Sequence, residues 1–448
     1  MARLANGLAP SFFPGTLEGR VLVDGRDVAD LESWEVAACV GSVFQNPRTQ
    51  FFNVDSTGEV AFSLESMAWP EERIRERTHD TIRQLGLEEL ADRSIFSLSG
   101  GEKQRIAYAS SWEPHPANLV LDEPTSNLDE AAIAALRRYL LDAKAQGAAV
   151  LVAEHRLWWL ADVADGVVVM EEGRIARRFD GATFRALPSS EVRDLGLRVR
   201  ALADERARER RAPGDAREPR APLVRLRGVH ASYGKREVLH GVDLDLREGE
   251  VAALVGAHGA GKSTLCRTIV GLHRESAGPT TLAGEPAGPK QRLRACSMVF
   301  QDVNYQLFAD SVRTEVSFGL TDAEAPDAAR VDEVLDGLGL AAYAERHPAT
   351  LSGGQKQRLA GAACIATGKR LLVFDEPTSG LDLGSMRTVA ALVRRLADEG
   401  RAVLVVTHDL EFIGQACDKA VRVEARRIAA EAVVEGDLQA VRELLAKG

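Results

Sequence analysis

A glycine-rich run that ends in a lysine and two hydroxyl residues is the most informative feature of the sequence. Gly256-Ala-His-Gly-Ala-Gly-Lys-Ser-Thr264 follows an apolar stretch at 251–255 and precedes a helical pattern that extends to about Leu272. Glycines in such a turn let backbone N–H groups converge on phosphate oxygens, and the helix N-terminus adds a favourable dipole. The run predicts a triphosphate-binding loop in which Lys262 supplies a charge and Ser263 a magnesium ligand. The other residues predicted to bind the nucleotide here are Gly256, Gly259, Gly261 and Thr264.

Two adjacent carboxylates end an apolar stretch later in the chain. Residues 371–374 read Leu-Leu-Val-Phe, and Asp375 and Glu376 follow directly. This placement suits Asp375 to hold magnesium and Glu376 to act as general base on an attacking water. The same pair could instead cap a helix, since acidic residues favour that position. The phosphate loop in the same half favours the catalytic interpretation.

Three further residues are candidates for contacting a nucleotide. His408 ends the apolar stretch 402–407 and resembles a polar switch at the γ-phosphate, although a lone histidine is more often structural. Gln301 is a candidate catalytic residue and magnesium ligand, with a plain loop amide as the alternative. Tyr233 precedes the phosphate loop by 23 residues and could stack on adenine, or be an exposed tyrosine on a hairpin.

The chain consists of two homologous halves. Leu98-Ser-Gly-Gly-Glu-Lys-Gln-Arg105 recurs 253 residues later as Leu351-Ser-Gly-Gly-Gln-Lys-Gln-Arg358. The same offset of 253 residues relates Asp122, Glu123 and His155 of the first half to Asp375, Glu376 and His408 of the second. Gln45 matches Gln301 at an offset of 256, which indicates a small loop insertion. A repeat of this length predicts two copies of one domain.

Apolar strands alternate with helical patterns in both halves. The first half predicts strands at 118–121 and 149–153 around a helix at 130–145, and the second half predicts strands at 371–374 and 402–406 around a helix at 384–397. This alternation is typical of βαβ units on a parallel sheet. Residues 193–222 are rich in Arg, Glu, Asp and Ala and predict a solvated linker, helical early and extended later.

Composition excludes several classes of protein. The chain has 448 residues, a net charge of −10 and 45% hydrophobic residues, which is typical of a soluble globular protein. No apolar run approaches the roughly 20 residues of a membrane-spanning helix. Five scattered cysteines predict neither a disulfide framework nor a zinc site. The N-terminus does not read as a secretory signal. The acidic balance makes nucleic acid an improbable partner, because phosphate-backbone affinity needs clustered basic residues.

The combined motifs resemble those of ATP-binding cassette (ABC) ATPases over about 223–423, and the first half carries all of them except the phosphate loop. The resemblance implies an α/β fold of two tandem P-loop NTPase domains. Each would have a mostly parallel sheet and a helical subdomain, with a complete antiparallel β subdomain in the second half only. The implied divisions are domain 1 at 1–190, a linker at 191–222 and domain 2 at 223–448, with ATP and Mg²⁺ as cofactors.

In this family two domains sandwich ATP head to tail, so the two halves are expected to be each other's partners. The resemblance implies that Ser99, Gly100 and Gly101 cap an ATP held by the second half, because a helix start offers N–H donors to a γ-phosphate. Glu102 replaces the commoner glutamine of this motif. A carboxylate suits a helix N-terminus but would repel a nearby triphosphate, which leaves its distance from ATP open.

The first half departs from the family pattern at its beginning. Asn6-Gly-Leu8 matches Val270-Gly-Leu272, so Met1 aligns near Leu265 and about 42 residues have no counterpart. The strand that enters the phosphate loop is among them. We therefore expect unpaired backbone groups, exposed apolar surface and a first half that is unstable alone. A gene model begun at an internal methionine is favoured over a protein with one dead site.

The segments 44–52 and 299–308 look most like the energy-coupling factor (ECF) branch of ABC importers, which takes up vitamins or transition-metal ions. The resemblance implies a peripheral protein on the cytoplasmic face of the membrane, working with an integral scaffold protein and a substrate-capture protein. The candidates to line grooves for the scaffold, or alternatively to fill the core, are Phe51, Phe52, Leu307 and Phe308. The alternatives are a soluble tandem ABC ATPase acting on ribosomes or nucleic acid, and a one-site regulatory ABC protein.

Overall fold

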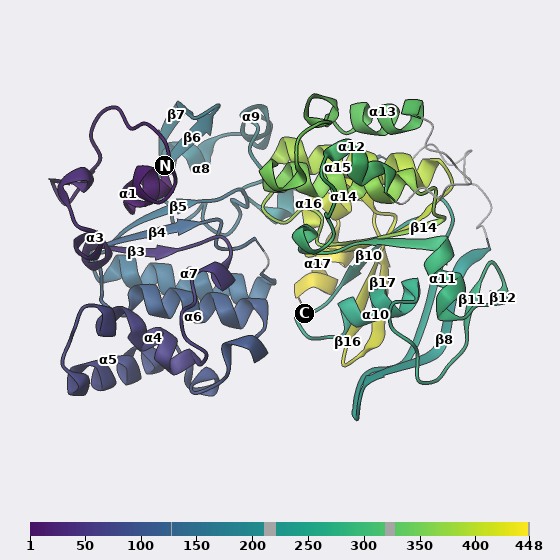
Figure 1. Ribbon diagram of the computed structural model, residues 1–448, viewed down its shortest axis with the longest axis horizontal. Coiled ribbons are helices and arrows are strands. Elements are labelled where there is room, and N and C mark those ends of the chain that lie inside the picture. Colours follow the sequence, from purple (N-terminus) through teal and green to yellow (C-terminus); the bar gives the residue numbers. More distant parts are fainter. Residues whose placement is uncertain (127, 210–220, 319–327, 447–448) are drawn as a thin grey trace. The chain divides into compact units, whose positions relative to one another are not determined.

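The computed structural model describes residues 1–126, 128–209, 221–318 and 328–446. They form two compact units, unit 1 at Met1–Pro188 and unit 2 at Ser189–Gly448 (Figure 1). Parallel sheets with helices and a separate antiparallel sheet confirm the predicted α/β class. The domain limits at 190 and 222 stay predictions, and residues 210–220 of the predicted linker lie outside the described part of the chain.

Unit 2 contains the more complete of the two sheets. Its strands are β8 (Pro222–Tyr233), β9 (Arg236–Arg247), β10 (Val251–Val255), β11 (Thr280–Leu282), β12 (Glu285–Pro286), β13 (Cys296–Val299), β14 (Leu371–Asp375), β15 (Ala402–Val406), β16 (Lys419–Glu424) and β17 (Arg427–Val433). Its helices are α9 (Ser189–Asp194), α10 (Lys262–Val270), α11 (Pro289–Ala295), α12 (Val312–Ser317), α13 (Ala328–Gly337), α14 (Gly353–Ala366), α15 (Leu383–Asp398), α16 (Leu410–Ala416) and α17 (Gln439–Ala446).

The main sheet of unit 2 has six strands in the order β13-β14-β15-β10-β16-β17. All neighbours are parallel except β16 and β17. Val251, Ala253 and Val255 join the hydrophobic core on one face of the sheet, while Ala252 and Leu254 join the core on the other. A strand covered on both faces must be apolar throughout, and β10 is. The strand that leads into the glycine-rich run is therefore buried along its whole length, as are β14 and β15.

The second sheet of unit 2 is antiparallel, with strand order β12-β11-β8-β9. Its long hairpin joins β8 to β9 from Pro222 opposite Arg247 to Tyr233 opposite Arg236. The hairpin places Tyr233 at the turn. This is the antiparallel β subdomain that the sequence predicts for the second half.

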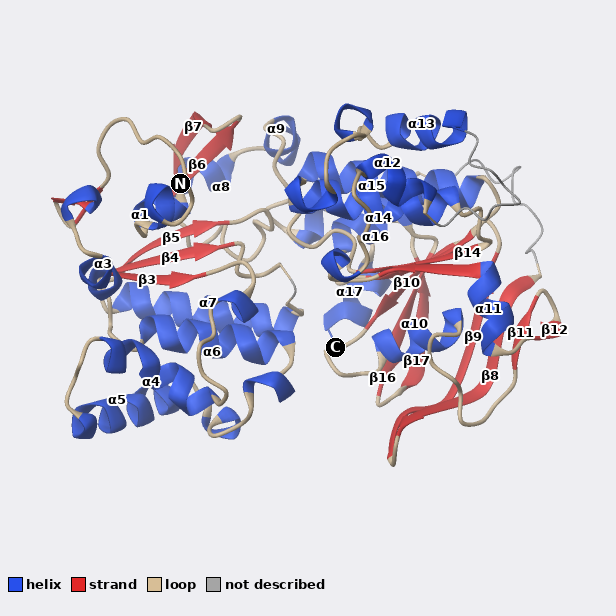
Figure 2. Cartoon of the chain, viewed as in Figure 1, coloured by secondary structure: helices blue, strands red, loops and turns tan. Residues whose placement is uncertain are grey.

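Unit 1 contains fewer strands. They are β1 (Leu22–Val23), β2 (Arg26–Asp27), β3 (Val40–Val43), β4 (Asn118–Asp122), β5 (Ala149–Ala153), β6 (Gly166–Glu171) and β7 (Arg174–Asp180). Its helices are α1 (Ala2–Ala5), α2 (Leu8–Ser11), α3 (Ser33–Cys39), α4 (Ser56–Ser66), α5 (Glu71–Gln84), α6 (Gly100–Trp112), α7 (Glu130–Ala145) and α8 (Gly181–Ala186). The helices α6 and α7 cover one face of a parallel sheet ordered β3-β4-β5 (Figure 2).

Among the described strands, the sheet of unit 1 ends at β5, whereas the sheet of unit 2 continues beyond the equivalent strand, β15. β15, the counterpart of β5, lies between β14 and β10, whereas β5 pairs with β4 alone among the described strands. Leu151 on β5 is 38% exposed, and its counterpart Leu404 is fully buried. β6 and β7 form a separate hairpin. The predicted unpaired edge and exposed apolar surface are therefore present in unit 1.

Residues 193–209 are the described part of the linker predicted at 193–222, and they are not uniformly solvated. Together with the start of α9 they make up the segment 189–209, which belongs to unit 2 and buries Val192, Arg198, Val199 and Glu205. Residue 207 donates its N–H to Gly436 O at 3.0 Å, and Arg208 donates its N–H to Gly414 O at 2.9 Å. The prediction was wrong here because buried carboxylates elsewhere in unit 2 pair with arginines of this segment, and composition alone does not reveal such pairs.

The open edge predicts unequal hydrogen exchange in the two sheets. Ala149 donates its N–H to Ala117 O, so the alternate amides of Val150 and Val152 point away from β4. In unit 2 the equivalent Val403 N–H donates to Glu250 O at 3.0 Å. We expect Val150 and Val152 to exchange faster than Val403 and Val405 by roughly a hundredfold or more, as measured by amide exchange on the whole chain. Equal protection of the two strands would show that the edge of β5 is covered.

Candidate functional site

The glycine-rich run forms a tight turn between β10 and α10 in unit 2. Gly256, Gly259 and Gly261 have φ values of 138°, 79° and 107°, in the region that L side chains rarely adopt. A Cβ on Gly256 would collide with Val423 O, and one on Gly261 would lie 3.1 Å from Val238 O. The backbone therefore needs glycine at both positions. Glycine adds no side chain at the start of α10, so the N–H groups there can approach an anion.

Lys262 starts α10 and folds back over the turn. Its side chain is largely buried, and Nζ donates hydrogen bonds to Gly256 O and, at 3.0 Å, to Ala257 O. A buried ammonium needs compensating oxygens, and loop carbonyls supply them here. Phosphate oxygens would be stronger partners for the same charge.

Ser263 and Asp375 lie side by side although they are 112 residues apart. Ser263 Oγ donates to Asp375 Oδ2 at 3.4 Å. Burial raises the pKa of Asp375, while the Ser263 hydroxyl and Lys262 oppose that rise. A hydroxyl and a carboxylate beside a phosphate loop are oxygen ligands of the kind Mg²⁺ takes together with substrate phosphates. The residues present therefore fit a magnesium ion.

Glu376 and His408 meet at the neighbouring strand ends. His408 Nε2 lies 3.6 Å from Glu376 Oε1, and both side chains are mostly buried. The backbone of Glu376 has a φ of 50°, and its N–H donates to Val406 O at 2.9 Å, so the chain turns sharply after β14. The His408 ring also stacks on His258 of the glycine-rich turn, with centroids 5.7 Å apart. The imidazole thus lies beside both the Glu376 carboxylate and the glycine-rich turn that precedes Lys262.

Gln301 lies exposed in the loop after β13. Two residues that belong to the repeated motif, but to which sequence reasoning assigned no role of their own, shape this loop. Gln306 accepts the N–H of Phe300 at 3.1 Å and donates to Met298 O at 2.9 Å. Glu315 on α12 accepts the N–H groups of Phe308 and Ala309 at 2.8 and 2.7 Å. The spacing from Phe300-Gln301 to Glu315 recurs in unit 1 between Phe44-Gln45 and Glu59. This repeat was the sequence signal for the structural role of the glutamate.

The loop of unit 1 is held in the same way. Gln50 accepts the N–H of Phe44 at 3.1 Å and donates to Ser42 O at 3.0 Å. Glu59 accepts the N–H groups of Phe52 and Asn53 at 2.9 and 2.8 Å. Burial raises the pKa of Glu59 against these hydrogen bonds.

Tyr233 lies at the turn of the β8–β9 hairpin. Its ring is 46% exposed and packs on the His273 ring, with centroids 4.4 Å apart. His273 follows α10, so the two rings mark the end of the helix that starts at Lys262. Stacking on adenine stays a prediction for Tyr233.

Ser99, Gly100 and Gly101 start α6 in unit 1 through a capping box. Ser99 Oγ accepts the N–H of Glu102 at 3.3 Å, and the Glu102 carboxylate accepts the N–H of Ser99 at 2.6 Å. Partial burial opposes ionisation of Glu102, but the Ser99 hydrogen bonds and Arg93 at 3.1 Å lower its pKa. Its charge is thus held by its own helix and by Arg93. Sequence reasoning noted the carboxylate and missed the box, which its S-x-x-E spacing signals.

Unit 1 repeats the carboxylate cluster without the glycine-rich turn. Gln45 Nε2 donates to Glu123 Oε2 at 2.7 Å, and His155 Nε2 lies 3.4 Å from Glu123 Oε1. Glu123 has a φ of 44°, like its counterpart Glu376. Burial and the adjacent Glu123 raise the pKa of Asp122. The arrangement of Gln45, Glu123 and His155 after β4 therefore forms from the repeated motifs and does not require a glycine-rich turn.

Comparisons with known proteins assign the family. A family model described as ABC transporter matches residues 5–126 and 239–379. The chain belongs to the ABC transporter ATPase family. The second match includes the glycine-rich turn, and the first begins beyond its equivalent. Members of this family bind and hydrolyse ATP, and this ABC protein carries two copies of the ATPase domain.

Relatives of this ABC protein span nearly its whole length. A Treponema denticola protein provisionally named an ABC transporter ATP-binding protein is 42% identical over 96% of this chain and 88% of its own. A Bacillus subtilis protein provisionally named the HMP/thiamine import ATP-binding protein YkoD is 30% identical over 93% of this chain and 81% of its own. The solved structure of cbiO1 from Clostridium perfringens, part of the transporter complex cbiONQ, is 27% identical over 50% of this chain and 93% of its own, with a TM-score of 0.45.

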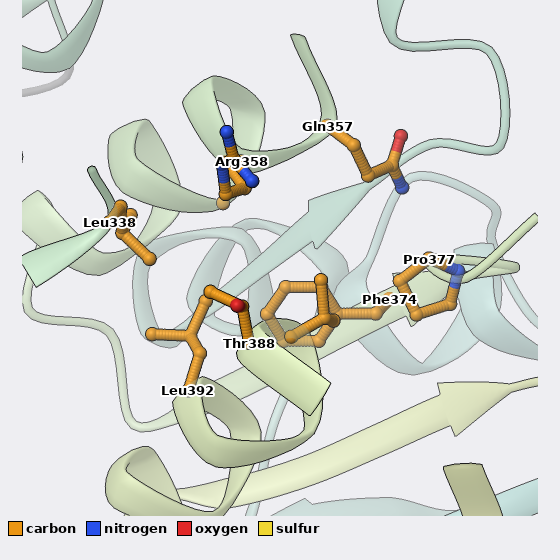
Figure 3. A pocket seen from close by; sticks show the side chains of 9 residues that line it. Leu338, Gln357, Arg358, Phe374, Pro377, Thr388 and Leu392 are labelled. Atoms are coloured by element: carbon orange, nitrogen blue, oxygen red, sulfur yellow. The ribbon is translucent and has the colours of Figure 1, made fainter. Parts of the chain in front are cut away.

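A small pocket of about 10 Å³ lies between α14, α15 and the end of β14 in the second ABC domain (Figure 3). Leu338, Phe374, Pro377 and Leu392 are among its lining residues. Its volume corresponds to roughly one water, so it cannot hold a nucleotide.

None of the helices in the described part of the chain combines the length and the apolar composition that a membrane span requires.

The raised pKa of Asp375 predicts a pH-dependent effect of its removal. Above the pKa of the folded state, the wild-type protein carries the cost of a buried charge, and below the ordinary pKa of 3.8 it does not. Asp375→Asn should therefore raise the melting temperature at pH 7.5 in magnesium-free buffer, with a smaller gain towards pH 4.5. Thermal unfolding at the two pH values measures the difference. A lower melting temperature at both would show that Asp375 is stabilised as an anion.

Proposed function

We propose that the glycine-rich turn of unit 2 holds the triphosphate of ATP and that Asp375 and Glu376 carry its hydrolysis. The supporting observation is the meeting of Lys262, Ser263 and Asp375 at one edge of the sheet, with Glu376 and His408 beside them. In this proposal the N–H groups at the start of α10 and the Lys262 ammonium neutralise phosphate oxygens. Gly256, Gly259, Gly261 and Thr264 form the cradle.

Ser263, Asp375 and Gln301 are the proposed protein ligands of magnesium. When bound, the ion supplies positive charge to the phosphate oxygens and orients them. Asp375 would exchange its hydrogen bond from Ser263 for this ion. Its burial, which raises the pKa of the carboxyl, makes the ionised form costly until a cation is present.

Glu376 is the proposed general base, and His408 the residue that orients it. The Glu376 carboxylate accepts the proton of an attacking water. The His408 imidazole, 3.6 Å away, keeps this carboxylate oriented towards the water. Tyr233 is proposed to stack on adenine. Ser99, Gly100 and Gly101 are proposed to offer N–H groups to the γ-phosphate of an ATP held by another ABC domain, as the family resemblance implies.

Glu376→Gln should uncouple ATP binding from hydrolysis. The amide keeps the size of the side chain but cannot accept the proton, so we expect turnover to fall by about 100-fold or more with ATP affinity almost unchanged. Steady-state phosphate release and equilibrium binding of ATP measure the two effects. The matched control is Glu123→Gln, which alters the equivalent carboxylate in the unit without a glycine-rich turn and should leave turnover within about twofold.

Two outcomes would contradict the assignment. Equal losses in the Glu376→Gln and Glu123→Gln proteins would mean that both carboxylates serve the reaction. Full turnover in the Glu376→Gln protein would exclude Glu376 as the base.

We further propose that hydrolysis drives uptake of a vitamin or metal ion through membrane partners of the ECF type, with this protein peripheral on the cytoplasmic face. The repeated loop pattern at 44–52 and 299–308 supports this proposal, as does the resemblance to a relative named for HMP/thiamine import. The net charge of −10 disfavours ribosomes or nucleic acid as the site of action.

Equivalent aromatic residues are available for a membrane partner in both units. Phe52 and Phe308 are each 74% exposed. The preceding residues, Phe51 and Leu307, are partly buried and pack against the hydrophobic cores. Of the four candidates, the structure therefore supports a docking role for Phe52 and Phe308 and a core role for the other two.

Phe308→Asp should weaken binding to the membrane subunits without lowering basal ATP turnover, because a carboxylate replaces an exposed apolar contact. Affinity purification of the tagged chain from detergent-solubilised membranes measures the association. Leu293→Asp, on α11 and also exposed, is the control that should retain binding. Co-sedimentation with ribosomes, together with no membrane subunit in the purified complex, would replace the importer proposal.

A further inference from the structure

A buried ion cluster fastens the segment 189–209 to the loop that carries His408. Arg198 is 3% exposed, and its Nε donates to Glu411 Oε2 at 2.6 Å. A terminal nitrogen of the same guanidinium donates to Asp409 Oδ1. The N–H of the next residue, Val199, donates to Glu411 Oε1 at 2.9 Å. One side chain and one backbone group of this segment thus bind two neighbouring carboxylates.

The cluster needs its arginine because both acids are buried. Asp409 and Glu411 are each 3% exposed. Burial raises the pKa of Glu411, and Arg198 opposes this rise. Burial likewise disfavours the charge of Arg198, but the two carboxylates more than compensate and raise its pKa above the ordinary value. Glu205, which pairs with Arg193 at 3.1 Å, is a third acid close to the cluster.

Asp409 extends the cluster to both strand ends that carry candidate catalytic residues. Its Oδ1 accepts the N–H of Phe412 at 3.2 Å and caps α16, and its Oδ2 accepts the hydroxyl of Thr378 at 3.1 Å. Thr378 is two residues beyond Glu376, and Asp409 directly follows His408. The carboxylate bound by Arg198 therefore joins the segment after β14 to the segment after β15.

Unit 1 solves the same structural problem within its own loop. The position of Asp409 is occupied by Arg156, and that of Thr407 by Glu154. Thr125, the counterpart of Thr378, donates its hydroxyl to Glu154 Oε2 at 2.6 Å, and Arg156 reaches Thr125 O at 3.5 Å. In unit 1 the carboxylate of Glu154 and the guanidinium of Arg156 belong to the same loop. In unit 2 the loop carries the carboxylates of Asp409 and Glu411, and the guanidinium comes from Arg198, which lies 211 residues before Asp409.

We propose that Arg198 is a positioning residue for ATP hydrolysis in unit 2. By binding Asp409 and Glu411 it fixes the loop 407–411, and through that loop it holds His408 against Glu376. The connection between the two ATPase domains is then part of the framework of one active site. This inference rests on the proposed roles of Glu376 and His408.

Arg198→Lys tests the proposal because it keeps a buried charge but removes the planar fork that reaches two carboxylates. We expect turnover at saturating ATP and Mg²⁺ to fall between roughly tenfold and a hundredfold, since small displacements of catalytic groups have effects of this size. Binding of a non-hydrolysable ATP analogue should change by less than about twofold. The ring resonances of His408, identified by their loss in a His408→Gln protein labelled with ¹⁵N-histidine, should shift.

The matched control is Arg208→Lys. Arg208 lies on the same segment and pairs with Asp418 at 2.7 Å, away from the loop 407–411. Asp418 keeps a second partner, Arg394, at 2.7 Å. We expect the control protein to keep wild-type turnover and unshifted His408 resonances.

The results separate this proposal from the assignment of the site. Wild-type turnover and unshifted His408 resonances in Arg198→Lys overturn the positioning role, while loss of turnover in Glu376→Gln alone leaves the site assignment in place. Parallel losses in the Arg198→Lys and Arg208→Lys proteins also overturn it, because they indicate a general loss of structure. If Arg198→Lys does not fold, Asp409→Asn serves instead. Its amide oxygen can still cap α16 and its amide N–H can donate to the Thr378 hydroxyl, but its charge pair with Arg198 is lost. Turnover should therefore fall several-fold, and full turnover would overturn the proposal.

Discussion

The position of β10 in the centre of a parallel sheet is the constraint on which the candidate site depends. Because β10, β14 and β15 run in the same direction as neighbours, their carboxyl ends meet at one edge. The turn after β10 presents Lys262 and Ser263, the end of β14 presents Asp375 and Glu376, and the end of β15 leads to His408. These residues are far apart in sequence, and this strand order brings Ser263 to Asp375 and places His408 beside Glu376.

The two units show what the same sequence pattern does with and without that central strand. In unit 1 the positions after β4 keep their strained backbone and their contacts, with Gln45 and His155 on Glu123. The carboxylate cluster is therefore a local consequence of the strand ends. What unit 1 lacks among its described strands is a partner on the outer edge of β5 and a turn that could cradle phosphate. The Gln, Glu and His of the repeated motifs consequently occur in both units, but within the described residues the glycine-rich turn accompanies them in unit 2 alone.

Much of the fold could be predicted from the sequence because its signals are local. The strands at 149–153, 251–255 and 402–406 and the helix at 130–145 have the predicted limits, and the helix predicted at 384–397 is one residue longer at each end. Apolar runs of this length, separated by helical periodicity, leave few alternatives in a parallel sheet. The turn at 256–264 was equally predictable, because its three glycines have φ values that L side chains rarely adopt.

The residues that sequence reasoning missed depend on distant partners. Arg198 reads as one of many charges in a polar segment, and nothing near it in the sequence indicates that Asp409 and Glu411 are buried together. Glu102 illustrates the opposite case, because its capping-box spacing was visible but its charge drew attention to repulsion instead. A direct measurement of the central claim is the number of ATP molecules bound per chain, determined with a non-hydrolysable analogue and Mg²⁺. We predict one site per chain that disappears in Lys262→Ala, whereas unchanged tight binding by that variant would contradict the account.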